Sequence, residues 1–291
     1  MNKKVKQMIA DTVYEMYEVS RKTRGPKIHV LSVDDTIKAI SNPKMSMIRF
    51  GDGEIQMIRG KALAFQKSNQ ELAEGLCEAL RAHDENLIIT IPDIFNGLDQ
   101  YEKPSQEFWK DHLLFCRKIY YENCDPKTAY GSTSVSRCYS TLRDQSKSGA
   151  WFASMRSIWN GKKVTVVEGA GSHTGVTNDL LDSAAEVERI LCPPSQAYAA
   201  YQEILNTCEK IDPERLVLLS IGPSAKPLGL ALFRKGYRIL DIGNLDTEYE
   251  WYRAGAKTKT DIPKHHILTE EENIKAGYTK YLYEVVTRIG C

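Results

Sequence analysis

Short apolar segments alternate with amphipathic segments through the second half of the chain, and this alternation restricts the fold more than any other feature. Four apolar runs predict buried strands, over 163–167, 187–191, 216–220 and 237–240. Helices are expected between them, over 175–183, 195–208 and 225–234. Strands that alternate with helices form a parallel sheet covered on both faces. We therefore expect an α/β fold with a Rossmann-like, mostly parallel sheet.

The first half of the chain is less regular but contains the same kinds of element. Apolar spacings of three and four predict helices over 2–22 and 69–81. A cap at Ser32 predicts a short helix over 32–40, and helices are also expected over 104–122 and 150–159. Strands are expected over 45–50 and 86–91, and the polar segment 130–136 is expected to be a loop. The helix over 2–22 either forms a dimer seam or packs on the core. No linker divides the rest, so we expect an N-terminal helix within 1–27 and a single domain over 28–291.

Composition excludes several classes of protein. The chain has 291 residues, 42% of them hydrophobic, and a net charge of +1, which argues against a nucleic-acid partner. Seven cysteines without a Cys-x-x-Cys pair are typical of a reducing compartment and of no zinc site. The sequence has no apolar run long enough for a transmembrane segment and no signal peptide. These features predict a cytoplasmic protein.

Four polar, glycine-rich segments each follow a predicted strand directly. Parallel strands joined by right-handed crossovers place their carboxyl ends at one edge of the sheet. Ligands of such sheets bind in the crevice at that edge. The four segments are therefore expected to converge on one site.

The first segment is Arg49–Glu54. The planar fork of Arg49 suits phosphate oxygens, and Gly51 lets the backbone approach a ligand closely. Asp52 and Glu54 are able to converge on a divalent cation or on sugar hydroxyls. The alternative is an ordinary turn, because Asp-Gly is a common turn dipeptide.

The second segment joins a predicted strand to a predicted helix at 168–175. Free amides at a helix N-terminus favour an anion such as a pyrophosphate. Gly169, Ser172, His173 and Gly175 are the candidates here. Many α/β loops look like this one, and His173 is equally well explained as a surface histidine.

The third segment, 221–225, supplies Gly222, Pro223 and Ser224 as candidates, with a plain helix cap at Ser224 as the alternative. Arg137 directly follows the polar segment 130–136. It is either a further candidate for binding phosphate or an ordinary surface residue.

The fourth segment, 241–251, is rich in acidic residues. Asp246 and Glu248 share one face if the segment is extended, whereas Asp246 and Glu250 lie one turn apart if it is helical. Carboxylate oxygens suit magnesium or manganese. The alternative is the acidic first turn of a solvated helix.

Taken together and in order, these motifs resemble those of the GT-D fold glycosyltransferases, formerly a bacterial domain of unknown function. The resemblance rests on RFGDGE (49–54), VEGxxSxxGVxND (167–179), RILCP (189–193), IGPSA (221–225) and DIGNLDTEYEW (241–251). It implies a UDP-sugar donor, a hexose such as glucose or galactose, and Mn²⁺ or Mg²⁺ held through an Asp-x-Glu motif. It also implies a glycan or glycoprotein acceptor in bacterial surface glycan or adhesin assembly.

Two Asp-x-Glu pairs compete for the implied metal. We favour Asp246 and Glu248 as metal ligands, with Asp52 and Glu54 as the alternative. Asp52, Glu54 and Glu248 are the expected catalytic residues, and Asn178 joins the expected donor-binding residues.

The chain departs from the family pattern at two positions. Asn244 stands where relatives carry histidine, and His173 stands where they often carry arginine. A catalytically altered nucleotide-binding domain is therefore one alternative function, and an S-adenosylmethionine-dependent methyltransferase is another. The expected partners are a nucleotide sugar and its acceptor, with a homodimer or other glycosyltransferases as further partners.

Overall fold

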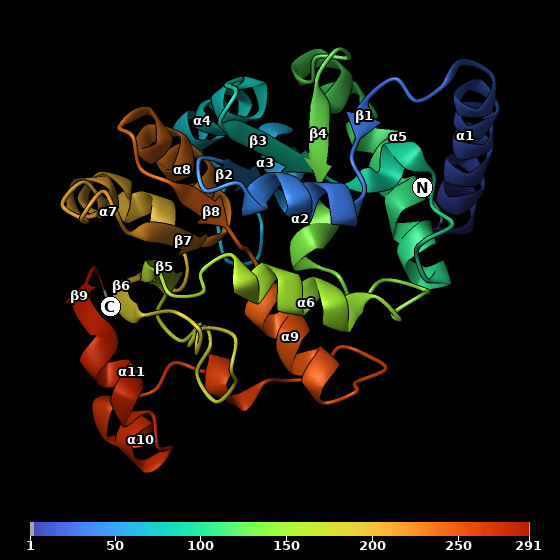
Figure 1. The fold of residues 1–291 in the computed structure, drawn as a ribbon. Coiled ribbons are helices and arrows are strands. Elements are labelled where there is room, and N and C mark those ends of the chain that lie inside the picture. Colours follow the sequence, from blue (N-terminus) through green and yellow to red (C-terminus); the bar gives the residue numbers. More distant parts are fainter. Residues whose placement is uncertain (1–2, 291) are drawn as a thin grey trace.

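A nine-stranded sheet runs through the computed structural model, which describes residues 3–290 (Figure 1). The strand order is β1-β4-β3-β2-β8-β7-β5-β6-β9, and every neighbouring pair is parallel. The predicted α/β fold with a parallel sheet is confirmed. The strands are β1 (His29–Val30), β2 (Ser46–Arg49), β3 (Leu87–Ile91), β4 (Ala129–Ser132), β5 (Lys163–Gly169), β6 (Glu186–Cys192), β7 (Leu216–Ser220), β8 (Ile239–Asp241) and β9 (Val285–Arg288).

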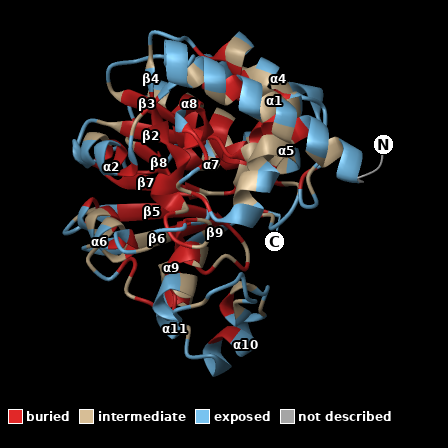
Figure 2. Cartoon of the chain, turned by 90° about the vertical axis from the view of Figure 1, so that its right-hand side faces the viewer, coloured by how far each residue is buried: buried red, intermediate tan, exposed pale blue. Residues whose placement is uncertain are grey.

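Helices cover both faces, and the buried strands lie between them (Figure 2). One face carries α3 (Asp52–Ile58), α4 (Gln70–Arg81), α5 (Lys103–Asn123), α7 (Tyr201–Cys208) and α8 (Ala225–Arg234). The other carries α2 (Val33–Ser41), α6 (Ser148–Ser157) and α9 (Leu245–Arg253). Successive residues of a strand point to opposite faces of the sheet: Ile48 packs against the helices of the first face, and Met47 packs against those of the other. Burial on both faces explains why these strands are continuously apolar.

Local signals in the sequence set several helix starts. The Ser32 side chain accepts a hydrogen bond from the amide of Asp35 and begins α2. The Asn69 side chain does the same for Leu72 at the start of α4. Each cap satisfies a backbone donor that the helix itself leaves free.

The N-terminal helix α1 (Lys3–Arg24) packs on α5. Ala10 and Tyr17 are buried, and the Tyr17 hydroxyl donates to the carbonyl of Phe95 at 2.9 Å. Packing on the core is therefore confirmed, although Met8 and Met16 remain exposed. The homodimer stays a prediction. Asn2, at the predicted start of this helix, lies outside the described residues.

Two segments differ in kind from the prediction, and the helix expected over 195–208 begins only at Tyr201, after a 3₁₀ turn, Ala197–Ala200. The helix expected over 175–183 is wrong: the segment is a series of turns, with His173 and Thr177 at φ values of 47° and 64°. The amides of Thr174 and Gly175 donate to side-chain carboxylates instead of starting a helix. The loop expected over 130–136 contains most of β4 and a 3₁₀ turn, Thr133–Ser136.

The structure settles one open alternative and adds C-terminal elements that the sequence did not predict. The acidic segment after β8 is helical and forms α9. The helices α10 (Glu270–Lys275) and α11 (Thr279–Glu284) lead to the edge strand β9. Within residues 3–290, the helices are all too short or too polar to cross a bilayer. Five cysteines in this range form no disulfide, namely Cys77, Cys116, Cys124, Cys138 and Cys208, and Cys291 lies outside it.

Candidate functional site

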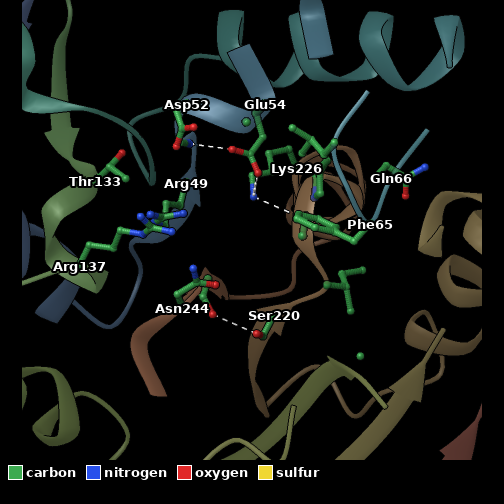
Figure 3. Close-up of a pocket in the computed structure, with 18 of the residues that line it drawn as sticks. Arg49, Asp52, Glu54, Phe65, Gln66, Thr133, Arg137, Ser220, Lys226 and Asn244 are labelled. Carbon is green, nitrogen blue, oxygen red and sulfur yellow. Dashed lines mark hydrogen bonds and ion pairs between the residues drawn. The ribbon is translucent and has the colours of Figure 1, made fainter. Parts of the chain in front are cut away.

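A cavity of about 360 Å³ opens at the carboxyl edge of the sheet, and we call it the edge pocket. The segments that follow β2, β4, β5, β6, β7 and β8 all contribute to its lining, so the predicted convergence occurs (Figure 3). It forms where β2 and β8 join the two halves of the sheet. The predicted site residues that line it are Arg49, Gly51, Asp52, Glu54, Arg137, Gly169, Ser172, Gly222 and Pro223.

Two arginines face one another in the edge pocket (Figure 3). Arg49 is 7% exposed, and the Nε atoms of both Arg49 and Arg137 are buried without a hydrogen-bond partner. Neither guanidinium forms an ion pair with a carboxylate within residues 3–290. Burial, and then the charge of Arg137, lower the pKa of Arg49. Buried cations with free donors are costly unless an anion satisfies them.

The acidic part of RFGDGE begins a helix. Asp52 and Glu54 lie in the first turn of α3, where negative charge is favourable. The Glu54 carboxylate accepts from the amide of Gly51 at 2.8 Å and closes the turn at the start of the helix. The segment is therefore a helix start that presents Asp52 to the edge pocket.

A buried lysine neutralises Glu54 beneath the edge pocket. The Nζ of Lys226, from α8, lies 2.8 Å from Glu54 and 3.0 Å from Asp241 at the end of β8. Burial alone would raise the pKa of Glu54, but Lys226 and then Arg49 outweigh it and lower that pKa to about 2. Asp52 has no such ion pair in the described chain, and burial raises its pKa.

The other Asp-x-Glu pair lies outside the edge pocket. Asp246 accepts from the Gly175 amide at 2.8 Å and forms an ion pair with Lys264 at 3.0 Å. Glu248 accepts from the backbone amides of Tyr139 and Ser140 at 3.2 and 2.8 Å. Asp246 and Glu248 lie two positions apart on α9, and their carboxylates contact different parts of the protein. The structure therefore does not bring the two carboxylates together.

Four further candidates also lie outside the lining of the edge pocket. His173 is buried, and its Nε2 lies 2.9 Å from Asn273 of α10. Asn178 donates to Asp246 at 2.8 Å, and the amide of Gly175 reaches the same carboxylate. Ser224 is fully buried at the N-cap position of α8, but its side chain makes no capping hydrogen bond. His173, Gly175 and Asn178 thus make contacts within the protein, away from the pocket lining.

Comparisons with known proteins agree with this architecture. The family model described as "Glycosyltransferase GT-D fold" matches residues 47–270. The chain belongs to the GT-D fold glycosyltransferases. A solved structure of domain of unknown function 1792, described as having a distinct glycosyltransferase fold, is 39% identical with a TM-score of 0.84, covering 91% of this chain and 96% of that one. A glycosyltransferase from Streptococcus sanguinis is 35% identical with a TM-score of 0.83, covering 90% and 100%.

Two curated relatives of this GT-D chain are longer proteins. A probable glycosyl transferase, Gly, of Streptococcus gordonii is 39% identical over 248 residues, which are 85% of this chain and 36% of the relative. The glycosyltransferase GlyD of Streptococcus pneumoniae is 38% identical over 247 residues, 84% of this chain and 30% of the relative. The GT-D chain thus spans about a third of the length of these relatives.

The pocket of this GT-D chain offers limited ligands to a divalent cation. Among residues 3–290, no three His, Cys, Asp or Glu side chains cluster as a metal site. Mg²⁺, however, is often held by one or two carboxylates together with substrate phosphates. Asp52 lines the edge pocket and fits that smaller donor set, whereas Asn244 lines the pocket on the other side of Arg49 (Figure 3). Glu54 does not, because Lys226 already occupies its carboxylate.

Several lining residues of the GT-D site were not singled out from the sequence as pocket residues. Lys226 is one; its signal is a lysine inside the apolar helix segment AKPLGLALF, where a charge needs a buried partner. Phe65, Thr133, Tyr101 and Trp109 also line the pocket. They lie in segments without a glycine-rich motif, so no local pattern indicated them.

Proposed function

We propose that this chain transfers a hexose, glucose or galactose, from a UDP-sugar to a glycan or glycoprotein acceptor in bacterial surface glycan or adhesin assembly, assisted by Mn²⁺ or Mg²⁺. The observation that carries the proposal is the pair of Arg49 and Arg137, which face the edge pocket without a carboxylate partner in the described chain. Guanidinium groups bind phosphate oxygens through paired, charge-assisted hydrogen bonds. A diphosphate satisfies both groups at once.

The arginine pair supports a role in the reaction as well as in binding. Negative charge builds on the diphosphate as the bond between sugar and phosphate breaks. Fixed cations that already point at that position stabilise the charge without reorganising. A divalent cation held mainly by the donor phosphates would neutralise further charge on the leaving group and leave the Asp52 carboxylate able to accept a proton.

Asp52 is the proposed general base of a single-displacement reaction. The acceptor hydroxyl loses its proton to the Asp52 carboxylate, and its oxygen bonds to the anomeric carbon. The bond from that carbon to the diphosphate oxygen breaks, and its electron pair leaves with the UDP. Two observations support Asp52 over Glu54: burial raises the pKa of Asp52, whereas that of Glu54 is about 2. A carboxylate with the higher pKa is the stronger base.

The wider setting is part of the same proposal. The two curated relatives of this chain are glycosyltransferases of streptococci, and they are more than twice its length, so the acceptor is proposed only as a class. Seven cysteines without a Cys-x-x-Cys pair are typical of a reducing compartment, and we propose the cytoplasm.

A panel of UDP-sugars tests the proposal. Release of UDP from UDP-glucose and UDP-galactose, with sugar acceptors present, should require Mn²⁺ or Mg²⁺ and should stop on addition of EDTA. Asp52→Asn should lower the rate by about 100-fold or more while UDP still binds. Asp144→Asn is the matched control, since Asp144 is exposed and lies outside the edge pocket.

Three outcomes would contradict the proposal in different ways. UDP binding without any turnover would indicate a nucleotide-binding domain that has lost catalysis. A thermal shift with S-adenosylmethionine and none with UDP would indicate a methyltransferase. Full activity in Asp52→Asn would remove Asp52 from the mechanism and leave the transferase assignment in place.

A further inference from the structure

Phe65 places an exposed aromatic ring at the edge pocket. Its side chain lines the pocket although the residue is 48% exposed. Leu63 and Gln66 pair across the tight turn that carries it. No aromatic ring or cation within the described residues stacks on the Phe65 ring. Ligand pockets are lined largely by hydrophobic and aromatic side chains, so an exposed ring in the lining of a pocket is available to a ligand.

The turn that carries Phe65 is fixed to the loop after β6. The Gln196 amide donates to the Phe65 carbonyl at 2.8 Å, and the Lys67 amide donates to the Gln196 side chain at 2.9 Å. Gln196 has a φ of 54°, which is unfavourable for a residue with a side chain. Strained backbone of this kind persists where the surroundings enforce it, often at ligand sites. Phe65 is therefore held in place before any ligand binds.

A glycine lets the ring lie close to the backbone after β7. Gly222 has a φ of +60°, and a Cβ at this position would come within 3.0 Å of Cε2 of Phe65. The ring edge thus packs on the bare backbone of Gly222. The rest of the side chain is exposed in the lining of the pocket.

We propose that Phe65 is the stacking platform for the nucleobase of the donor; this inference rests on the proposed function. The edge pocket combines a cationic side, at Arg49 and Arg137, with an aromatic side at Phe65, and the two lie opposite one another (Figure 3). A nucleoside diphosphate has the same division, with charge at one end and a flat ring at the other. An acceptor sugar belongs elsewhere, because it must reach Asp52, on the arginine side.

Stacking on an aromatic ring tolerates any base, since every base has a π-face. The platform therefore contributes affinity for the nucleoside part and none for the phosphates. This difference makes the proposal testable with two small probes, UDP and inorganic pyrophosphate. Calorimetric titration of the full chain, with and without Mn²⁺, measures both.

Phe65→Ala should weaken UDP binding by about 5- to 100-fold and leave pyrophosphate binding within about twofold of the wild type. Phe65→Tyr keeps the ring and should retain UDP affinity. Phe108→Ala is the matched control, because Phe108 is 45% exposed on α5 and does not line the edge pocket. Arg137→Gln should weaken both probes.

Each remaining outcome overturns the inference. Equal weakening of UDP and pyrophosphate in Phe65→Ala would mean that the substitution only disturbs the pocket. Unchanged UDP affinity with a raised KM for the acceptor would assign the ring to the acceptor, while the proposed function stands. A wild-type chain that binds neither UDP nor a UDP-sugar would overturn both the inference and the proposed function.

Discussion

The ammonium group of Lys226 lies 2.8 Å from the carboxylate of Glu54, and this contact ties α8 to the first turn of α3 beneath the edge pocket. Both side chains are more than nine-tenths buried. The pair holds RFGDGE in place from below and leaves Asp52 and Arg49 to face the edge pocket. The two carboxylates of the motif therefore differ: Glu54 positions the segment, and Asp52 lines the pocket.

Removing Lys226 should destabilise the protein strongly. Lys226→Met leaves Glu54 and Asp241 buried without their cation, and breaking such a pair costs about 3–5 kcal/mol. Urea denaturation measures the free energy of unfolding. Lys235→Met is the control, because Lys235 forms an exposed pair with Glu209 at 3.3 Å and should cost less than about 1 kcal/mol. Equal losses in the two variants would refute the structural role of Lys226.

Glu54 should make stability depend on acid pH. Its folded pKa of about 2 lies below the ordinary value of 4.5, so the folded state binds the proton more weakly than the unfolded state. The stabilisation is complete above pH 4.5 and is lost as the pH falls toward 2. The shift corresponds to about 3 kcal/mol. Guanidinium denaturation of wild type and Glu54→Gln across this range should show the extra loss in the wild type alone; parallel curves would contradict it.

The arginine pair should govern affinity for the diphosphate. Arg49→Gln and Arg137→Gln each remove charged donors from the edge pocket, and each should weaken pyrophosphate binding by about 10- to 100-fold. Arg143→Gln, an exposed arginine outside the lining of the pocket, should have no effect. Calorimetry provides the measurement. Unchanged affinity in both pocket variants would remove the observation on which the proposed function rests.

Asp246 should support the fold and not the metal. Asp246→Asn weakens a buried network with Lys264 and His265, and we expect it to lower the free energy of unfolding by about 3 kcal/mol. Affinity for UDP with Mn²⁺ should stay within about threefold of the wild type. A variant of normal stability that no longer responds to Mn²⁺ would restore Asp246 as a metal ligand.

Much of the fold was predictable because its determinants are local. Continuous apolar runs at 163–167 and 216–220 indicate strands that are buried on both faces, and the side chains of Ser32 and Asn69 mark helix starts. The helix expected over 175–183 fails for a non-local reason. Its first amide donates to Asp246, which is distant in the chain, so the turns there depend on tertiary contacts.

The candidate site was predictable only in part, for the same reason. That Arg49, Asp52 and Gly222 meet at one edge follows largely from parallel strand order, which the alternation of strands and helices already implies. Arg137 joins them through β4, a strand that the sequence did not predict. Which carboxylate is free does not follow from the sequence. The two Asp-x-Glu motifs have the same sequence pattern. They differ only in which side chains and backbone amides from distant parts of the chain contact their carboxylates.

The sequence by itself determined a parallel α/β sheet and the edge at which its polar segments gather, because periodicity and strand–helix alternation are properties of neighbouring residues. Only the tertiary structure decided that Lys226 neutralises Glu54, that Lys264 and His265 contact Asp246, and that Asp52 is left facing the edge pocket. The physical reason is that the charge state and freedom of a buried carboxylate depend on cations from distant parts of the chain.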